Sequence, residues 1–89
     1  MNKAVIIQVY GRVQGVGFRF YTQKKARELD MTGHVRNRPD GSVYIEAAGE
    51  AGNMKLFTKW CEEGPSWAHV TKIELQEIPF FKADDFRIK

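Results

Sequence analysis

The hydrophobic pattern of this chain switches between a period of two and a period of about 3.6, and the order of these switches constrains the fold most strongly. Apolar residues alternate along residues 4–10, which is typical of a strand, and a glycine-rich stretch ends this strand. A helical pattern follows, with one apolar side formed by Phe18, Thr22, Ala26 and Leu29. Gly33 stands where such a helix would stop.

The rest of the chain repeats this alternation of strand and helix. The expected elements are, in order, a strand over 34–38, a tight turn at Pro39-Asp40-Gly41, a strand over 43–48, a break bracketed by Gly49 and Gly52, a helix over 54–61 that ends at Gly64-Pro65, a strand from Thr71 to about Ile78, and a possible short edge strand over 86–88.

The order β-α-β-β-α-β is typical of the ferredoxin-like α+β fold. Right-handed crossovers place both helices on one face of the sheet, which we expect to be antiparallel with the strand order 4-1-3-2. A short fifth strand could extend one edge. A length of 89 residues suits a single domain, spanning residues 1–89, with one hydrophobic core.

Charge and cysteine content narrow the class of protein. The net charge of +3 suits a small anionic ligand and does not exclude nucleic acid. A single cysteine, Cys61, forms no intramolecular disulfide, which fits a reducing compartment. No apolar run is long enough for a signal peptide or a membrane span. We expect a cytoplasmic monomer that has no nucleic-acid or membrane partner and needs no cofactor. A metal site is not expected because His34 and His69 lack the spacing of metal ligands.

The stretch GRVQGVGFR, residues 11–19, is the strongest candidate for a binding site. Glycines let backbone N–H groups point toward one place, and the loop opens onto a helix N-terminus, which favours an anion. Arg19 adds a planar cation that suits two phosphate oxygens. Glycine-rich turns between a strand and a helix are also common without any ligand, so both interpretations stand at this point.

The predicted topology brings a second residue to the same place. The first and second strands run parallel with the third between them, so their carboxyl ends lie about 10 Å apart at one edge of the sheet. Asn37 lies near the end of the second strand and shares the parity of Val35, which places it on the helix-covered face. The loop, Arg19 and Asn37 are therefore expected to converge on a phosphate-sized group.

Two segments together resemble the signatures of a known family. GRVQGVGFR and the later GHVRNRPDGSV, residues 33–43, closely resemble the two signature segments of the acylphosphatase family, and GPSWAHV at residues 64–70 is also similar. His34 departs from the large aromatic residue that is usual there, and the chain ends at Lys89, where relatives often carry a tyrosine. Neither position carries the chemistry.

The resemblance implies hydrolysis of acyl phosphates, without a metal, to a carboxylate and inorganic phosphate, which would be product and inhibitor. It implies that Arg19 and Asn37 are the catalytic residues: Arg19 would bind the phosphoryl group and Asn37 would orient the attacking water. The phosphate-binding loop would be formed by the backbone of Gly15, Val16, Gly17, Phe18 and Arg19.

The remaining residues offer no obvious acid, base or nucleophile near the loop. Asp40 lies in a turn, His34 faces away from Asn37, and His69 follows the second helix. This suits an acyl phosphate, whose carboxylate leaving group has a conjugate acid with a pKa of about 4–5 and needs no protonation. Cys61 is expected to be a small core residue.

Other side chains carry weaker expectations. Trp60 and Trp67 are expected to pack in the core and at the helix end. Three arginines would either attract an anionic substrate or form a solvated face of the protein: Arg12, Arg36 and Arg38.

Two other functions remain open at this stage. The same fold hosts RNA-recognition domains, and GVGFRF echoes their aromatic signature, but that signature belongs on the third strand. Here the third strand offers only Tyr44 on the open face, beside Tyr10, Arg36 and Arg38. The other alternative is a non-catalytic, regulatory acylphosphatase-like domain, of the kind found inside larger carbamoyl-transfer proteins.

Overall fold

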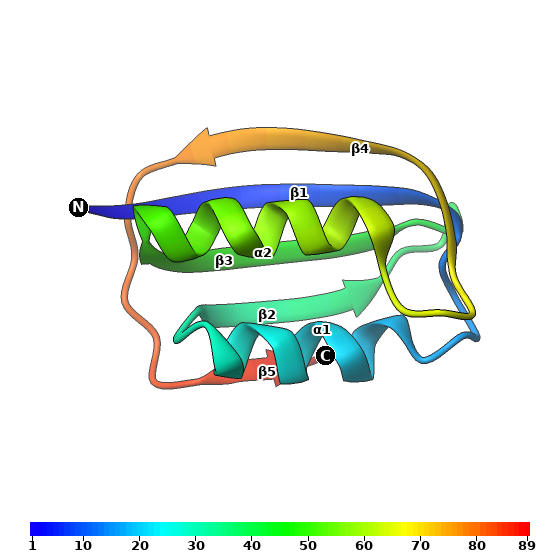
Figure 1. Ribbon diagram of the computed structural model, residues 1–89, viewed down its shortest axis with the longest axis horizontal. Coiled ribbons are helices and arrows are strands. Elements are labelled where there is room, and N and C mark those ends of the chain that lie inside the picture. The colour runs from blue at the N-terminus through cyan, green and yellow to red at the C-terminus, as the bar shows by residue number, and fades with distance from the viewer.

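A five-stranded sheet forms one layer of the protein, and two helices cover one of its faces (Figure 1). The computed structural model describes residues 1–89. The elements are β1 (Asn2–Arg12), α1 (Phe18–Glu28), β2 (Thr32–Asn37), β3 (Val43–Glu50), α2 (Ala51–Glu63), β4 (His69–Ile78) and β5 (Phe86–Ile88).

The strand order is β4-β1-β3-β2-β5, which confirms the predicted order 4-1-3-2, the ferredoxin-like fold and the short fifth strand. The sequence left the direction of the fifth strand open. The first four strands are antiparallel, but β5 pairs parallel with β2, so the sheet is mixed. The reason is visible in Figure 1: β4 ends at the side of the sheet where β2 begins, and the connection therefore enters β5 in the direction of β2.

The end of α1 differs from the prediction. The helix stops at Glu28, before Gly33, and Asp30 takes a left-handed conformation (φ 55°) just after its end. The Met31 N–H donates to the Ala26 carbonyl at 2.8 Å and completes the helix end. The strand then starts two residues earlier than expected, and Gly33 lies inside β2.

The start of α2 also differs, because no break separates it from β3. Gly49 lies in β3 and Gly52 in the first turn of α2. The Glu50 carboxylate accepts a hydrogen bond from the Asn53 N–H at 3.1 Å and so caps the helix. Glutamate is not a usual capping residue, so the sequence did not indicate a helix start at this position. The two glycines instead predicted a break in the chain that the structure does not have.

A core of fifteen buried residues fills the space between the sheet and the helices. The apolar face of β1 contributes Val5, Ile7 and Val9, as its alternation predicts. Cys61 is fully buried there, and burial raises the pKa of its thiol, as expected of a core residue. Trp60 packs against Phe18 with ring centroids 5.7 Å apart.

The expectation that Trp67 packs at the helix end was wrong, because 79% of this residue is exposed. Trp67 lies in the segment that connects α2 to β4, and it is not part of the core cluster.

A bulge in β1 directs the chain out of the sheet. The register with β4 shifts between Tyr10 and Gly11, and a Cβ on Gly11 would lie 2.2 Å from the His69 carbonyl oxygen. Only glycine permits this approach. Beyond the bulge, β1 continues to Arg12 and then enters the loop that precedes α1.

Candidate active site

The loop between β1 and α1 presents main-chain donors that the protein itself does not use. Gly15 and Gly17 are both left-handed, with φ of 75° and 79°, and Gly17 begins α1 without a side-chain cap. The N–H groups of Gly15, Val16 and Gly17 donate to no main-chain acceptor. The first N–H groups of α1 have no partner within the helix either. Together with the helix dipole, these donors form a site suited to an anion.

The side of the loop at Gly15 is open. Apart from Gly15 and its two chain neighbours, no protein atom lies within 4 Å of the position that a Cβ would occupy on Gly15.

Arg19 lies in the first turn of α1 and is half-buried. Its Nη1 donates to the main-chain oxygen of Lys89 at 3.5 Å, and the Lys89 N–H donates to the Val35 carbonyl at 2.9 Å. These contacts hold the guanidinium beside β2 and β5. Arg19 takes part in none of the salt bridges between side chains.

Asn37 ends β2, where it pairs with Val43. Its Oδ1 atom is buried and receives no hydrogen bond from the protein. A buried acceptor without a donor costs about 1–3 kcal/mol, so such atoms in native proteins call for an explanation. A water molecule that donates to Oδ1 would satisfy it.

Gln14 links these two parts of the site, and the sequence interpretation did not single it out. Its Nε2 donates to the Arg38 carbonyl at 2.7 Å and to the Ser42 carbonyl at 2.9 Å. The loop is thereby tied to the residue that directly follows Asn37. The only feature of the sequence that could have indicated this role is that Gln14 is a single polar residue between Val13, which is buried, and the glycines.

The turn after Asn37 is held by Asp40. The Asp40 carboxylate accepts hydrogen bonds from the Ser42 hydroxyl at 2.6 Å and from the Ser42 N–H at 2.9 Å. These bonds to Ser42 lower the pKa of Asp40. Asp40 is thus engaged in the turn between β2 and β3.

The two histidines lie in different parts of the structure. His34 stacks against Tyr44, with ring centroids 6.0 Å apart, and burial lowers the pKa of His34. His69 begins β4, opposite Arg12. No group of three or more His, Cys, Asp or Glu side chains comes together in the structure.

Neither helix has the length and apolar character that crossing a membrane requires.

The three arginines of interest separate into two environments. Arg36 and Arg38 lie over the Tyr44 ring, 4.6 and 5.2 Å from its centroid. Arg12 instead lines a surface hollow of about 620 Å³ together with Gln14, Gly15, Val16 and Trp67. Of the three, Arg12 is the one placed beside the loop.

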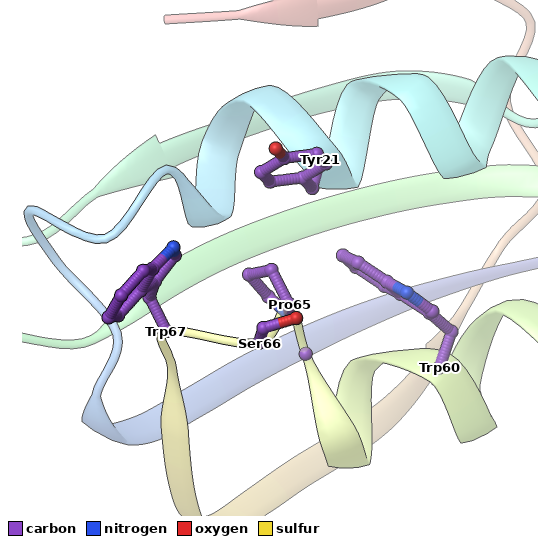
Figure 2. Close-up of a pocket in the computed structure, with 6 residues that line it drawn as sticks. Tyr21, Trp60, Pro65, Ser66 and Trp67 are labelled. Atoms are coloured by element: carbon purple, nitrogen blue, oxygen red, sulfur yellow. The ribbon is translucent and has the colours of Figure 1, made fainter.

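A second hollow, of about 340 Å³, adjoins the start of α1 (Figure 2). It is lined by Tyr21, Trp60, Gly64, Pro65, Ser66 and Trp67. Trp67 therefore borders both hollows.

The sheet order and the two helices on one face define a ferredoxin-like protein, with a loop of free N–H groups at the end of β1. Comparisons with known proteins specify the family. The Acylphosphatase family model matches residues 5–88. An acylphosphatase of Marinobacter nauticus is 52% identical over 71 residues, which cover 80% of this chain and 77% of that protein.

Solved structures agree with this match. The structure of an acylphosphatase from Coxiella burnetii superposes with a TM-score of 0.95 at 39% identity, covering 99% of this chain and 93% of that one. Full-length HypF, in a phosphate- and nucleotide-bound form, matches with a TM-score of 0.89 at 29% identity, but the match covers only 12% of that chain against 100% of this one. The chain belongs to the acylphosphatase family, a family of enzymes whose known activity is the hydrolysis of acyl phosphates.

Proposed function

We propose that this protein is an acylphosphatase in which Arg19 and the loop bind the phosphoryl group and Asn37 orients the attacking water. The observation that carries this proposal is the buried, unpartnered Oδ1 of Asn37, tied through Arg38 and Gln14 to a loop of free N–H groups. An acceptor and a set of donors thus lie at one end of the sheet, as hydrolysis of a phosphate compound requires.

The loop binds the charge of the substrate. The N–H groups of Gly15, Val16, Gly17, Phe18 and Arg19 donate to phosphoryl oxygens, as peptide dipoles at a helix N-terminus do. The guanidinium of Arg19, held beside the end of the chain by its bond to Lys89, supplies further N–H donors in a planar arrangement. These groups are fixed before the substrate arrives, so they stabilise charge on the equatorial oxygens of the transition state without reorganisation.

Asn37 acts on the nucleophile. Its Oδ1 accepts one hydrogen from water and so turns a lone pair of the water oxygen toward phosphorus. The water oxygen forms a bond to phosphorus while the bond from phosphorus to the acyl oxygen breaks, and its electron pair leaves with the carboxylate. The proton from water goes to a phosphoryl oxygen, which gives dihydrogen phosphate and balances the reaction.

The leaving group explains why such a site suffices. A carboxylate whose conjugate acid has a pKa of about 4–5 leaves without protonation, whereas an alkoxide would need an acid or a metal. The reaction is therefore expected to proceed without a metal ion, and activity should survive EDTA.

The decisive assay is hydrolysis of benzoyl phosphate and acetyl phosphate in EDTA by the wild type and Asn37→Ala. We expect kcat to fall with little change in KM, because water is positioned only for the chemical step. Asn2→Ala is the matched control, since Asn2 is exposed at the opposite end of β1. Near-normal kcat in Asn37→Ala, or a strict requirement for Mg²⁺, would contradict the mechanism.

A non-catalytic role is the second candidate, favoured by the match to a small part of HypF. The same assay separates the two, because a regulatory domain would bind phosphate without turnover. The RNA-binding alternative has weaker support, since Arg36 and Arg38 already lie over the Tyr44 ring on which a base would stack. Micromolar binding of single-stranded RNA that phosphate does not displace would revive it.

The proposal extends to the surroundings of the enzyme. A single buried cysteine suits the reducing cytoplasm. We expect a monomer with one site per chain, and competitive inhibition by inorganic phosphate because the product binds the same loop. Sedimentation and inhibition kinetics measure both.

A further inference from the structure

We propose that Trp67 forms the subsite for the acyl group, so that the enzyme favours acyl phosphates with a flat, apolar acyl group over acetyl phosphate. This inference rests on the proposed function and adds the part of the substrate that the phosphate loop does not contact.

The first argument is the exposure of Trp67. An indole that is 79% exposed contributes little to the core, whereas Trp60 packs against Phe18. The Ala68 N–H donates to the Pro65 carbonyl at 2.9 Å, which closes a turn with Trp67 inside it. The backbone of Trp67 is thus held in place while its side chain remains at the surface.

The second argument is the position of Trp67 beside the phosphate loop. It borders a hollow that also includes Gly15 and Val16, two of the residues proposed to bind phosphate. Trp67 also borders a second hollow, which is lined in part by Tyr21, Trp60 and Pro65 and lies beside α1 (Figure 2). An acyl group attached to a phosphate in the loop therefore has aromatic surface within reach of its first few atoms.

The third argument is the direction of the reaction. In phosphoryl transfer the attacking and leaving oxygens lie roughly in line, on opposite sides of phosphorus. Asn37, proposed to hold the water, ends β2, which lies on one side of β1 with β3 between them. Trp67 precedes β4, which lies on the other side of β1. With the loop at the end of β1, the acyl group leaves toward Trp67.

These positions predict substrate preference. Contact between an aromatic acyl group and an indole gives about a threefold to tenfold gain in affinity. The phosphoryl group contributes equally for every acyl phosphate, so the gain should appear in KM for benzoyl phosphate and be absent for acetyl phosphate. The preference should depend on the ring of Trp67 and not on the loop.

The test compares both substrates in the wild type, Trp67→Ala and Trp67→Phe. We expect Trp67→Ala to raise KM for benzoyl phosphate about threefold to tenfold and to leave acetyl phosphate unchanged, with Trp67→Phe retaining most of the preference. Leu56→Ala is the control, because Leu56 is a similarly exposed apolar residue (57%) on α2 in a separate hollow. Equal effects on both substrates, or no effect on either, would overturn the subsite.

A binding measurement keeps the subsite testable apart from turnover. Titration calorimetry with benzoylphosphonate, which cannot be hydrolysed at its C–P bond, should show weaker binding to Trp67→Ala, while the affinity for inorganic phosphate stays the same. If the wild type hydrolyses nothing but shows this pattern, the proposed catalysis fails and the subsite stands. If hydrolysis is normal and benzoylphosphonate binds both proteins equally, the subsite fails alone.

Discussion

The side chain of Gln14 binds the main-chain oxygen of Arg38 at 2.7 Å, and so joins the loop that follows β1 to the residue that follows Asn37. These segments are far apart in the sequence and come from strands separated by β3. The side chain of Gln14 therefore helps to fix the position of the loop relative to Asn37.

Gln14→Ala should impair both stability and catalysis. It leaves the Arg38 and Ser42 carbonyls without their side-chain donor, which we expect to lower the free energy of unfolding by about 1–3 kcal/mol. Misplacement of the loop relative to Asn37 should also lower kcat. Urea denaturation and steady-state kinetics measure the two effects.

The matched control for this change is Gln23→Ala. Gln23 also donates its Nε2 to a main-chain carbonyl, that of Phe86, at 2.9 Å, but on the β5 side of α1. It should lose stability of the same order and keep its kcat. A Gln14→Ala enzyme with unchanged kcat would show that the amide is structural only.

Arg19→Ala should weaken the binding of inorganic phosphate and lower kcat/KM by about 10²-fold or more, since removal of one donor to a developing oxyanion has an effect of this size. Arg27→Ala on the same helix is the control. Arg27 pairs with Asp85 at 2.7 Å on the surface, where solvent screens the pair, so its loss should change stability little and leave the kinetics unchanged.

Gly15→Ala should separate backbone geometry from side-chain chemistry. A Cβ at φ 75° costs about 1–2 kcal/mol, and the added methyl would stand on the open side of the loop. Gly41→Ala has a comparable strain at φ 92°, also with no atom within 4 Å of its Cβ. Similar stability losses are expected in both, with weaker phosphate binding only in Gly15→Ala, as titration calorimetry would show.

Asp40→Asn should reduce stability in a pH-dependent manner. Hydrogen bonds from Ser42 lower the pKa of Asp40 in the folded state, so the charged carboxylate stabilises the fold above its ordinary pKa of 3.8. This contribution is lost as the pH falls through the lowered folded pKa. Denaturation of both proteins should therefore show a difference at pH 6 that disappears in strong acid. A difference that grows with acid would contradict this assignment.

The sequence predicted most of the fold because alternation and helical spacing report which side of each element is buried. It also predicted that Asn37 shares the face of Val35, since parity along a strand needs no knowledge of distant residues. The bonds from Gln14 to Arg38 and Ser42 join positions 24 and 28 residues apart, and no local pattern reports such a contact.

The sequence did not predict the exposure of Trp67 or the direction of β5, because both depend on contacts that no local pattern reports. A tryptophan after a helix is apolar whether it packs inside or stands at the surface, and only the turn closed by Ala68 and Pro65 decides that it is exposed. The direction of β5 depends on where its connection crosses the sheet, which residues 86–88 do not encode by their alternation.

The loop proposed to bind phosphate does so through peptide groups, which has a consequence for how activity depends on pH. Peptide N–H groups, a guanidinium and a carboxamide keep one charge state over the range in which proteins stay folded. The catalytic apparatus proposed here thus contains no proton-dependent switch of its own. Its pH–rate profile should follow the ionisation of the substrate phosphate, and two substrates with different phosphate ionisation should give shifted profiles on one unchanged enzyme.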